Sequence, residues 1–404
     1  MNISRKRFLR TLGFGTILGS LPQSGLLHSE AMQQARAAAR GMKIKEIEIF
    51  HYDIPLIEPF TIAIGTMYAA NNVLVRIRTD SGIVGLGEAC PFTPITGDTQ
   101  DTSIAAAKDL RTIAVGKDPL AVESLIKQFG ALAHTNPSTV AAFDMALYDI
   151  LGKVASLPLY RLFGGDRSSF ETDITVSLDT TEKMIRSAKE FASRGYKTIK
   201  IKVGTDPDVD VERLQSMREA VGPNLNFRID ANQGWTVAQA IYALKRMEPV
   251  RIQFVEQPVH RSDLAGMKRV RDESPIPVMA DESLFLPADA IQLIRADACD
   301  YFNIKLTKAA GIFNSIKIAH IADAANIRCM LGCMIDSRLA LTAAAHVVAA
   351  HGNITFADLD GNIEHTVDPV IGGMIVKEGI ITLPEGPGLG VDVDPAFLKR
   401  MKKV

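Results

Sequence analysis

Five charged residues, from the middle of the chain onward, recur at nearly constant spacing. They are Lys202, Asp230, Glu256, Asp281 and Lys305, and the steps between them are 28, 26, 25 and 24 residues. Each ends a short apolar run of the kind that forms a β-strand. If each step is one strand–helix unit, the five side chains meet at the face where the carboxyl ends of parallel strands converge. Three carboxylates and two amines there could bind a cation and move protons.

The three carboxylates predict a metal site. Asp230 in "RIDAN", Glu256 in "VEQP" and Asp281 in "ADES" come from three consecutive units. Taken singly, each could equally be a helix N-cap or a strand-end ion pair. Held together they repel one another unless a cation lies between them. Few oxygen ligands with open positions suit Mg²⁺ better than Ca²⁺, so we expect one Mg²⁺ per subunit.

The two lysines predict a pair of bases. We expect Lys202 and Lys305 to flank the metal from opposite sides of the barrel mouth. A carbon next to a carboxylate is a very weak acid, and removing its proton requires a nearby base and a cation that stabilises the resulting negative charge. A second lysine on the opposite face could return the proton, which inverts the carbon. Alone, Lys305 could be a structural lysine at a strand end.

A second lysine lies beside the first base. In "YKTIKIKV", Lys200 and Lys202 alternate with apolar residues, so both side chains point to the same face of a strand. For most such pairs the explanation is a solvated strand face. Here we expect Lys200 to make Lys202 easier to deprotonate, because a neighbouring cation disfavours the charged form of an amine. We also expect Lys200 to donate a hydrogen bond to the enolate oxygen.

Eight short apolar strands alternate with amphipathic helical segments after Phe170. Continuous apolar strands in such alternation favour parallel β/α units. Eight units favour a closed TIM-type (β/α) barrel, although pattern alone does not exclude an open sheet. The strands are "ETDITVSL", "YKTIKIKV", "NLNFRID", "RIQFVEQP", "IPVMADES", "DYFNIKL", "IRCMLGCM" and "NITFADLD". We therefore assign residues 169–369 to an α/β barrel domain.

The preceding segment has a different pattern. Alternating strands flank the turn Asp80-Ser81-Gly82, and three helical segments follow them. Strands followed by helices predict an α+β unit. We assign residues 42–168 to this capping domain and expect residues from about 370 to 404 to pack back on it.

The motifs "KIK", "RIDANQGW", "VEQPV", "MADES" and "NIKLTKAAG" occur in order. With the cap-and-barrel layout, they resemble the enolase superfamily, muconate-lactonizing-enzyme subgroup, over essentially the whole chain from Met42. This resemblance implies lysine bases with magnesium.

The stretch "ITFADLDGN" narrows the resemblance. Asp358 and Asp360 form a D-x-D at the end of the eighth strand, which is similar to the dipeptide epimerase family, including L-Ala-D/L-Glu epimerase. The resemblance implies a dipeptide substrate whose α-ammonium group binds these aspartates. It also implies that Thr175 and the run Cys333, Met334 and Ile335 contact the substrate. Peptides from peptidoglycan turnover would fit such an enzyme.

Two positions depart from the family pattern. Where Ala-Glu epimerases carry a capping-loop arginine for the glutamate side chain, the stretch "TIAIGTMY" has Gly65. An apolar or small second residue, as in Ala-Ala, is therefore an alternative to glutamate. The second departure is Asp336 in "GCMIDS", where the family has glutamate; the sequence gives it no role.

Two other functions remain open. A lyase or cycloisomerase of the same superfamily, such as muconate cycloisomerase or o-succinylbenzoate synthase, would use the same barrel, but Asp358 and Asp360 disfavour an anionic aromatic acid. A non-catalytic binding protein would be expected to have lost at least one of the two lysines or three carboxylates.

Composition excludes little else. The chain has 404 residues, 45 of them basic and 46 acidic, so nothing points to a nucleic-acid partner. Four cysteines show neither zinc-ligand spacing nor a disulfide pattern. Barrels of this kind often self-associate, so a homo-oligomer is possible.

The first 41 residues read as a signal peptide. "MNISRKRFLRTLGFGTILGSL" has a basic start and an apolar run that is too short to span a membrane. "SRKRFLR" resembles a twin-arginine export signal, with Lys6 in place of the second arginine. We expect an exported, periplasmic protein that is not a transmembrane protein. The alternatives are an uncleaved anchor, or a cytoplasmic protein translated from Met42.

Overall fold

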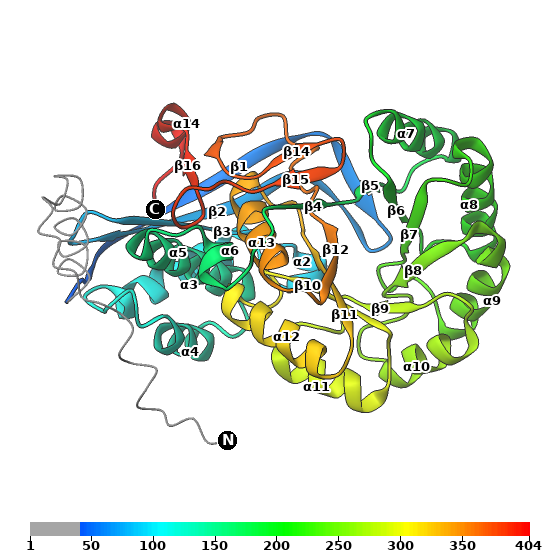
Figure 1. Cartoon of the computed structure of the whole chain (residues 1–404), viewed down its shortest axis with the longest axis horizontal. Helices are drawn as coiled ribbons and strands as arrows, with labels where there is room; N and C mark the ends of the chain where they lie inside the picture. Colours follow the sequence, from blue (N-terminus) through cyan, green and yellow to red (C-terminus); the bar gives the residue numbers. More distant parts are fainter. Residues whose placement is uncertain (1–40) are drawn as a thin grey trace, which may run out of the picture. The chain divides into compact units, whose positions relative to one another are not determined.

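Eight parallel strands form the centre of the fold, and each lies within one of the eight segments that the sequence predicts as strands (Figure 1). They are β5 (Ile174–Val176), β6 (Thr198–Lys202), β7 (Asn226–Asp230), β8 (Ile252–Glu256), β9 (Val278–Ala280), β10 (Tyr301–Lys305), β11 (Arg328–Gly332) and β12 (Ile354–Asp358). They lie in sequence order, and the backbone N–H of Asp173 beside β5 donates to the carbonyl of Ala357 in β12 at 3.1 Å. The sheet is therefore a nearly closed barrel, which confirms the predicted fold class.

Helices follow the strands and cover the outside of the barrel. They are α7 (Thr181–Ser193), α8 (Pro207–Val221), α9 (Val237–Met247), α10 (Leu264–Glu273), α11 (Pro287–Ala296), α12 (Ile312–Ala324) and α13 (Arg338–Ala350), with a 3₁₀ turn η2 (Glu248–Val250). Several begin at a polar cap, as α9 does, where Thr236 and Gln239 form a reciprocal capping box. Every residue of β6 is buried, because one face of the strand is covered by helices and the other faces the side chains that fill the barrel.

An antiparallel sheet and a helical layer form the cap. The sheet contains β1 (Ile44–Ile62), β2 (Gly65–Thr79) and β3 (Val84–Ala89), and the helices are α2 (Thr93–Thr96), α3 (Gln100–Ala114), α4 (Val122–Leu132), α5 (Pro137–Ala155) and α6 (Leu159–Leu162). The predicted turn between β2 and β3 is present: Thr79 N–H donates to Ile83 O, and Gly82 has φ +86°.

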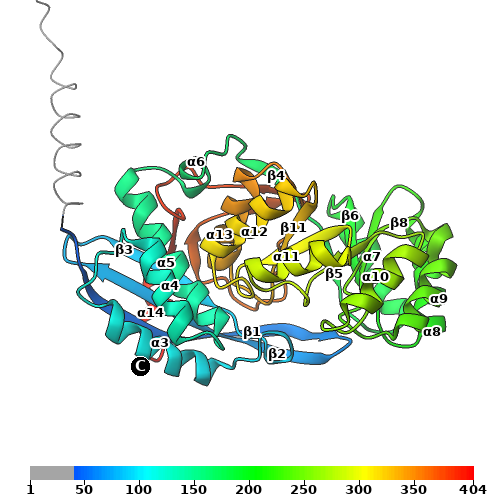
Figure 2. The same ribbon diagram turned by 90° about the horizontal axis from the view of Figure 1, so that it is seen from below.

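The β1–β2 hairpin extends from the cap helices toward the part of the barrel that holds β5 and α7 (Figure 2). Near its tip, Thr61 O accepts a hydrogen bond from Leu178 N–H, and Glu58 pairs with Lys183 of α7 at 2.6 Å. The hairpin therefore brings residues of the cap to the barrel mouth.

The C-terminal segment returns to the cap. Its elements are β13 (Val370–Gly372), β14 (Ile375–Lys377), β15 (Ile380–Thr382), β16 (Val391–Val393) and α14 (Pro395–Arg400), and β15 also pairs with β4 (Ser169–Glu171). Val404 N–H donates to Ile49 O in β1 at 3.0 Å. Residues Met42–Val404 form one compact unit, and the boundaries given above for cap and barrel stay a prediction.

His346 joins the barrel helix α13 to segments outside the barrel. Its Nδ1 accepts a hydrogen bond from Tyr160 N–H in α6, and its Nε2 lies 3.2 Å from Leu389 O, to which it donates. The two bonds require the neutral ring, and burial lowers the pKa of His346 to about 4.

The computed structural model describes residues 41–404. The expected signal peptide and export signal lie outside the described residues. Within them, no helix combines the length and the apolar composition needed to cross a membrane.

Candidate active site and metal centre

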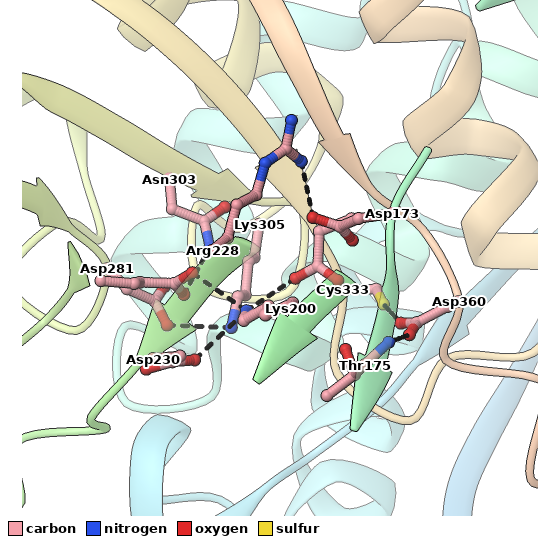
Figure 3. A network of polar contacts seen from close by, with 12 residues as sticks. Asp173, Thr175, Lys200, Arg228, Asp230, Asp281, Asn303, Lys305, Cys333 and Asp360 are labelled. Atoms are coloured by element: carbon pink, nitrogen blue, oxygen red, sulfur yellow. Dashed lines mark hydrogen bonds and ion pairs between the residues drawn. The ribbon is translucent and has the colours of Figure 1, made fainter. Parts of the chain in front are cut away.

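Three carboxylates meet at the carboxyl ends of neighbouring strands. Asp230, Glu256 and Asp281 lie at the ends of β7, β8 and β9, are fully buried, and each offer an oxygen within 4.8 Å of the others. Figure 3 shows Asp230 and Asp281 directed toward the same space as two lysines. The strand order explains this convergence, because each of these strands lies beside the next.

The carboxylate set fits a magnesium ion. Oε2 of Glu256 is buried and lies 2.9 Å from Lys200 Nζ, whereas its Oε1 accepts a hydrogen bond from Asn303 Nδ2 at 2.8 Å. Three carboxylates whose oxygens lie within 4.8 Å of one another repel, and a divalent cation between them relieves that repulsion. All three ligands are hard oxygens, and they leave further coordination positions for water or substrate. A magnesium ion fits the space between Asp230, Glu256 and Asp281.

Two lysines face this centre from opposite sides of the barrel. Lys202 ends β6 and Lys305 ends β10, which lie four strands apart in the eight-stranded order. Nζ of Lys202 lies 2.7 Å from Asp230 Oδ2, and Nζ of Lys305 lies 2.9 Å from Asp281 Oδ2. Burial lowers the pKa of Lys305, but the charges of Asp281, Glu256 and Asp230 together outweigh burial, so that the pKa is raised above its usual range.

Lys200 lies between the metal ligands and the D-x-D aspartates. Its Nζ is 3.2 Å from Asp230, 2.9 Å from Glu256 and 2.8 Å from Asp358. Burial lowers the pKa of Lys200, but the carboxylates, Asp358 foremost, raise it well above its ordinary value. The side chain therefore remains protonated and can act as a fixed positive charge and hydrogen-bond donor.

Other side chains in contact with these groups, besides Asn303, are absent from the sequence predictions. Asn232 Oδ1 accepts a hydrogen bond from Lys202 at 3.1 Å, and its Nδ2 donates to Glu282. The fully buried Lys308 contacts both the carboxylate and the backbone carbonyl of Asp281. Asn232 and Lys308 lie two and three residues after strand-end charges, and this spacing is the signal that could have found them.

Asp358 and Asp360 form a second acidic site. Asp358 Oδ1 is buried without a hydrogen-bond partner. Asp360 accepts hydrogen bonds from the backbone of Thr175 at 2.6 Å and from the thiol of Cys333 at 3.7 Å (Figure 3). Burial raises the pKa of Asp358, but the neighbouring lysines, Lys200 foremost, lower it by more, so that it is about 2. For Asp360, burial and the charge of Asp358 raise the pKa to about 6. This site carries net negative charge at neutral pH.

A cavity of about 40 Å³ lies among these groups, with side chains of both the barrel and the cap around it. Its barrel side includes the three lysines and the two aspartates of the D-x-D, together with the predicted contact residues Thr175, Cys333, Met334 and Ile335. The structure thus brings the predicted substrate-binding residues to one cavity, and their individual roles stay predictions.

The cap contributes four apolar side chains to the same cavity: Phe60, Ile62, Phe92 and Ile95. Periodicity does not mark these four residues, although the stretches that contain them, "IPLIEPFTIAIGTMYAANNV" and "PFTPITGDT", resemble the capping loops of the family. Gly65 does not line the cavity; a Cβ there would lie 3.4 Å from Pro94.

Asp336 lies behind the cavity wall. Its Oδ2 accepts a hydrogen bond from Met334 N–H at 2.6 Å, and burial raises its pKa to about 6. Glu88 of β3 lies close by and accepts hydrogen bonds from Ser337 N–H and Oγ. Asp336 therefore fixes the backbone that carries Met334 and Ile335.

Comparison with known proteins places the chain in a family. Residues 44–164 match the family described as "Mandelate racemase / muconate lactonizing enzyme, N-terminal domain", and residues 183–397 match "Enolase C-terminal domain-like". The chain is 42% identical to the L-Ala-D/L-Glu epimerase of Bacillus subtilis over 90% of this chain and 100% of that protein. It is 40% identical to the hydrophobic dipeptide epimerase of Enterococcus faecalis over 87% of this chain and 99% of that protein.

A solved structure is similar over the same range. The dipeptide epimerase of Cytophaga hutchinsonii, in complex with Mg and the dipeptide D-Ala-L-Val, matches 90% of this chain and 99% of its own with a TM-score of 0.88 and 40% identity. The chain belongs to the enolase superfamily and, within it, to the magnesium-dependent dipeptide epimerases, which are isomerases.

Proposed function

We propose that the protein epimerises dipeptides of the Ala-Xaa type at the α-carbon of the second residue, by a two-base 1,1-proton transfer. The observation that carries the proposal is the placement of Lys202 and Lys305 on opposite sides of one cavity that also contains an acidic site for an ammonium group. Proton removal on one side and proton return on the other inverts the carbon between them.

The substrate is oriented by its two charged ends. Its α-ammonium group binds Asp358 and Asp360, where Asp358 Oδ1 is a buried acceptor with no protein partner. Its carboxylate lies toward Asp230, Glu256 and Asp281, which would hold one Mg²⁺ per subunit. When bound, that ion neutralises the carboxylate side chains and stabilises negative charge on the substrate carboxylate.

The lysines exchange roles with the direction of reaction. The carboxylate pairs of Lys202 and Lys305 are those of the protonated amines. In the reaction, one of the two lysines in its neutral form removes the α-proton with its Nζ, and the ammonium of the other donates a proton to the opposite face. Lys200 stays protonated and donates a hydrogen bond to the substrate carboxylate as charge develops there.

The test is incubation of a dipeptide library with the purified protein and Mg²⁺ in D₂O, followed by mass spectrometry. Deuterium gained at the α-carbon of the second residue supports the proposal. Absence of exchange in every dipeptide, with metal bound, favours the lyase or cycloisomerase alternative instead, which assays with muconate and succinylbenzoate precursors would then test.

We also propose that the protein acts outside the cytoplasm. The support is the sequence "SRKRFLR" with the apolar run that follows it. Cell fractionation with the full chain and with an Arg5→Lys, Arg7→Lys variant tests this: the natural chain should be periplasmic and the variant should not. Size-exclusion chromatography with light scattering tests the proposed homo-oligomer.

A further inference from the structure

The cap covers the cavity with an apolar cluster that the reaction itself does not require. Ile62, Phe92 and Ile95 are buried together, and Phe60, Ile64, Met67, Phe285 and Met334 pack against them. We call these eight residues the capping cluster. We propose that the cluster selects dipeptides whose second residue is apolar, such as leucine, valine or phenylalanine, over those ending in glutamate; this rests on the proposed function.

The direction of the second side chain follows from the other three substituents of the α-carbon. Its hydrogen faces Lys202 or Lys305. Its carboxylate faces the three metal ligands, and its nitrogen leads to the residue held by Asp358 and Asp360. The remaining direction leads out of the barrel mouth. Phe60, Ile62, Phe92 and Ile95 line the cavity there.

Both epimers must use this same space. When the α-carbon loses its proton it becomes planar, and its carboxylate, nitrogen and side chain lie in one plane between the two lysines. The carboxylate and the nitrogen are held at the barrel, so the side chain stays directed at the cap in both epimers. An apolar surface suits this requirement, because it attracts a side chain without demanding one hydrogen-bond geometry.

Among the described residues that line the cavity, no cation without a carboxylate partner faces the second side chain. Lys200, Lys202 and Lys305 all pair with carboxylates of the barrel, and the cap side contributes only apolar residues. A glutamate side chain placed among them would lose its hydration without gaining a partner, which disfavours its charged form strongly.

One arginine lies at the outer edge of the capping cluster. Arg261 is exposed, its Nη1 donates to Ile95 O at 3.3 Å, and its guanidinium carbon lies 5.8 Å from the centre of the Phe285 ring. It supports the backbone of the cap segment from outside and does not line the cavity. Because Arg261 is the cation at the edge of the capping cluster, it is the residue that could bind a glutamate side chain if the inference were wrong. Its substitution therefore serves as a control.

The test measures deuterium incorporation in D₂O with Mg²⁺ for L-Ala-L-Leu, L-Ala-L-Phe, L-Ala-L-Glu and L-Ala-L-Lys in direct competition. We expect kcat/KM for the leucine or phenylalanine dipeptide to exceed that for the glutamate dipeptide by at least about 100-fold. Equal or better use of L-Ala-L-Glu overturns the inference and leaves the proposed function intact. Exchange in none of the four overturns both.

Substitutions in the cap locate the selectivity. Ile62→Arg places a cation in the cluster and should shift the leucine-to-glutamate ratio toward glutamate by at least about 10-fold, whereas Ile62→Met, of similar reach without charge, should keep the preference for leucine. Arg261→Gln should leave the ratio unchanged. A selective loss of glutamate use in Arg261→Gln would assign the second side chain to Arg261 and overturn the inference, even if the Ile62 variants failed to fold.

Discussion

The barrel mouth and the capping cluster face one cavity but have opposite chemistry. The barrel side presents buried charges that lie 2.7–3.2 Å apart, such as those between Lys200 or Lys202 and their carboxylate partners. The cap side presents the apolar side chains of Ile62, Phe92 and Ile95, packed against further apolar side chains. The difference separates two tasks: fixed charges perform the proton transfer, and an apolar surface chooses the side chain that accompanies it.

The largest expected effect is the loss of either lysine. Lys202→Ala or Lys305→Ala should reduce epimerisation by at least about 10³-fold, because the α-proton then has no base or no acid on one face. Initial rates by chiral chromatography measure it, with circular dichroism to verify folding. If both variants still epimerise at more than a few per cent of the natural rate, the reaction does not depend on the charges of the barrel mouth.

Metal removal should act on the barrel side alone. Chelation with EDTA should lower deuterium exchange by at least about 100-fold for every dipeptide, without changing the ratio between them, because the carboxylate ligands serve a group common to all substrates. Adding Mg²⁺ should restore the rate, and adding Na⁺ at equal ionic strength should not. Undiminished exchange in EDTA would show that Asp230, Glu256 and Asp281 serve only as partners of the lysines.

Asp358→Asn should weaken substrate binding more than it slows exchange within the bound complex. We expect KM to rise roughly 10- to 100-fold, because one charge-assisted hydrogen bond to the ammonium group is lost. The control is an N-acetylated dipeptide, which has no ammonium group: its KM should hardly respond to the substitution. An unchanged KM for the free dipeptide would remove the ammonium-binding role.

Changes in the cap should alter selectivity and spare the chemistry. Ile95→Ala should lower kcat/KM for L-Ala-L-Leu by about 3- to 10-fold and change that for L-Ala-L-Ala less, because only the longer side chain reaches the capping cluster. Parallel steady-state assays measure the ratio. A uniform loss for both dipeptides would mean that the cap contributes to the reaction itself, and the comparison between the two regions would fail.

His346 tests what holds the barrel and the neighbouring segments together. Its pKa in the fold is about 4, below its ordinary 6.5, so the unfolded chain takes up a proton that the folded chain refuses as the pH falls from 6.5 to 4. The free energy of unfolding should therefore decrease over that window, by about 3 kcal/mol at most. Urea unfolding at several pH values between 4 and 6.5 gives the free energy of unfolding of the natural protein and of His346→Gln. The free energy should fall more steeply with decreasing pH in the natural protein than in the variant, and an equal pH dependence would contradict this contribution.

The predictability of the fold differs between the two regions. The eight strands and the strand-end charges follow from periodicity and spacing, because each βα unit repeats and the parallel sheet brings its strand ends to one face. The capping cluster does not follow in this way. Phe60 and Ile62 come from a hairpin tip and Phe92 and Ile95 from a short helical segment, and only their tertiary packing shows that they meet over the barrel.

The same contrast applies inside the barrel mouth. Lys200 is recognisable from its strand pattern, but its triple ion pair with Asp230, Glu256 and Asp358 depends on strands that are distant in sequence. Asn232 and Lys308 follow the strand-end charges closely in sequence, but only their contacts with Lys202 and Asp281 show what they do.

The central claim is that two lysines act on opposite faces of one carbon. Its most direct test is solvent deuterium exchange by Lys202→Ala and Lys305→Ala, each measured separately on both epimers of one dipeptide with Mg²⁺ bound. The account predicts that each variant exchanges the α-proton of one epimer only, that the two variants act on opposite epimers, and that neither converts one epimer into the other. Exchange of the same epimer by both variants, or of both epimers by either one, would contradict it.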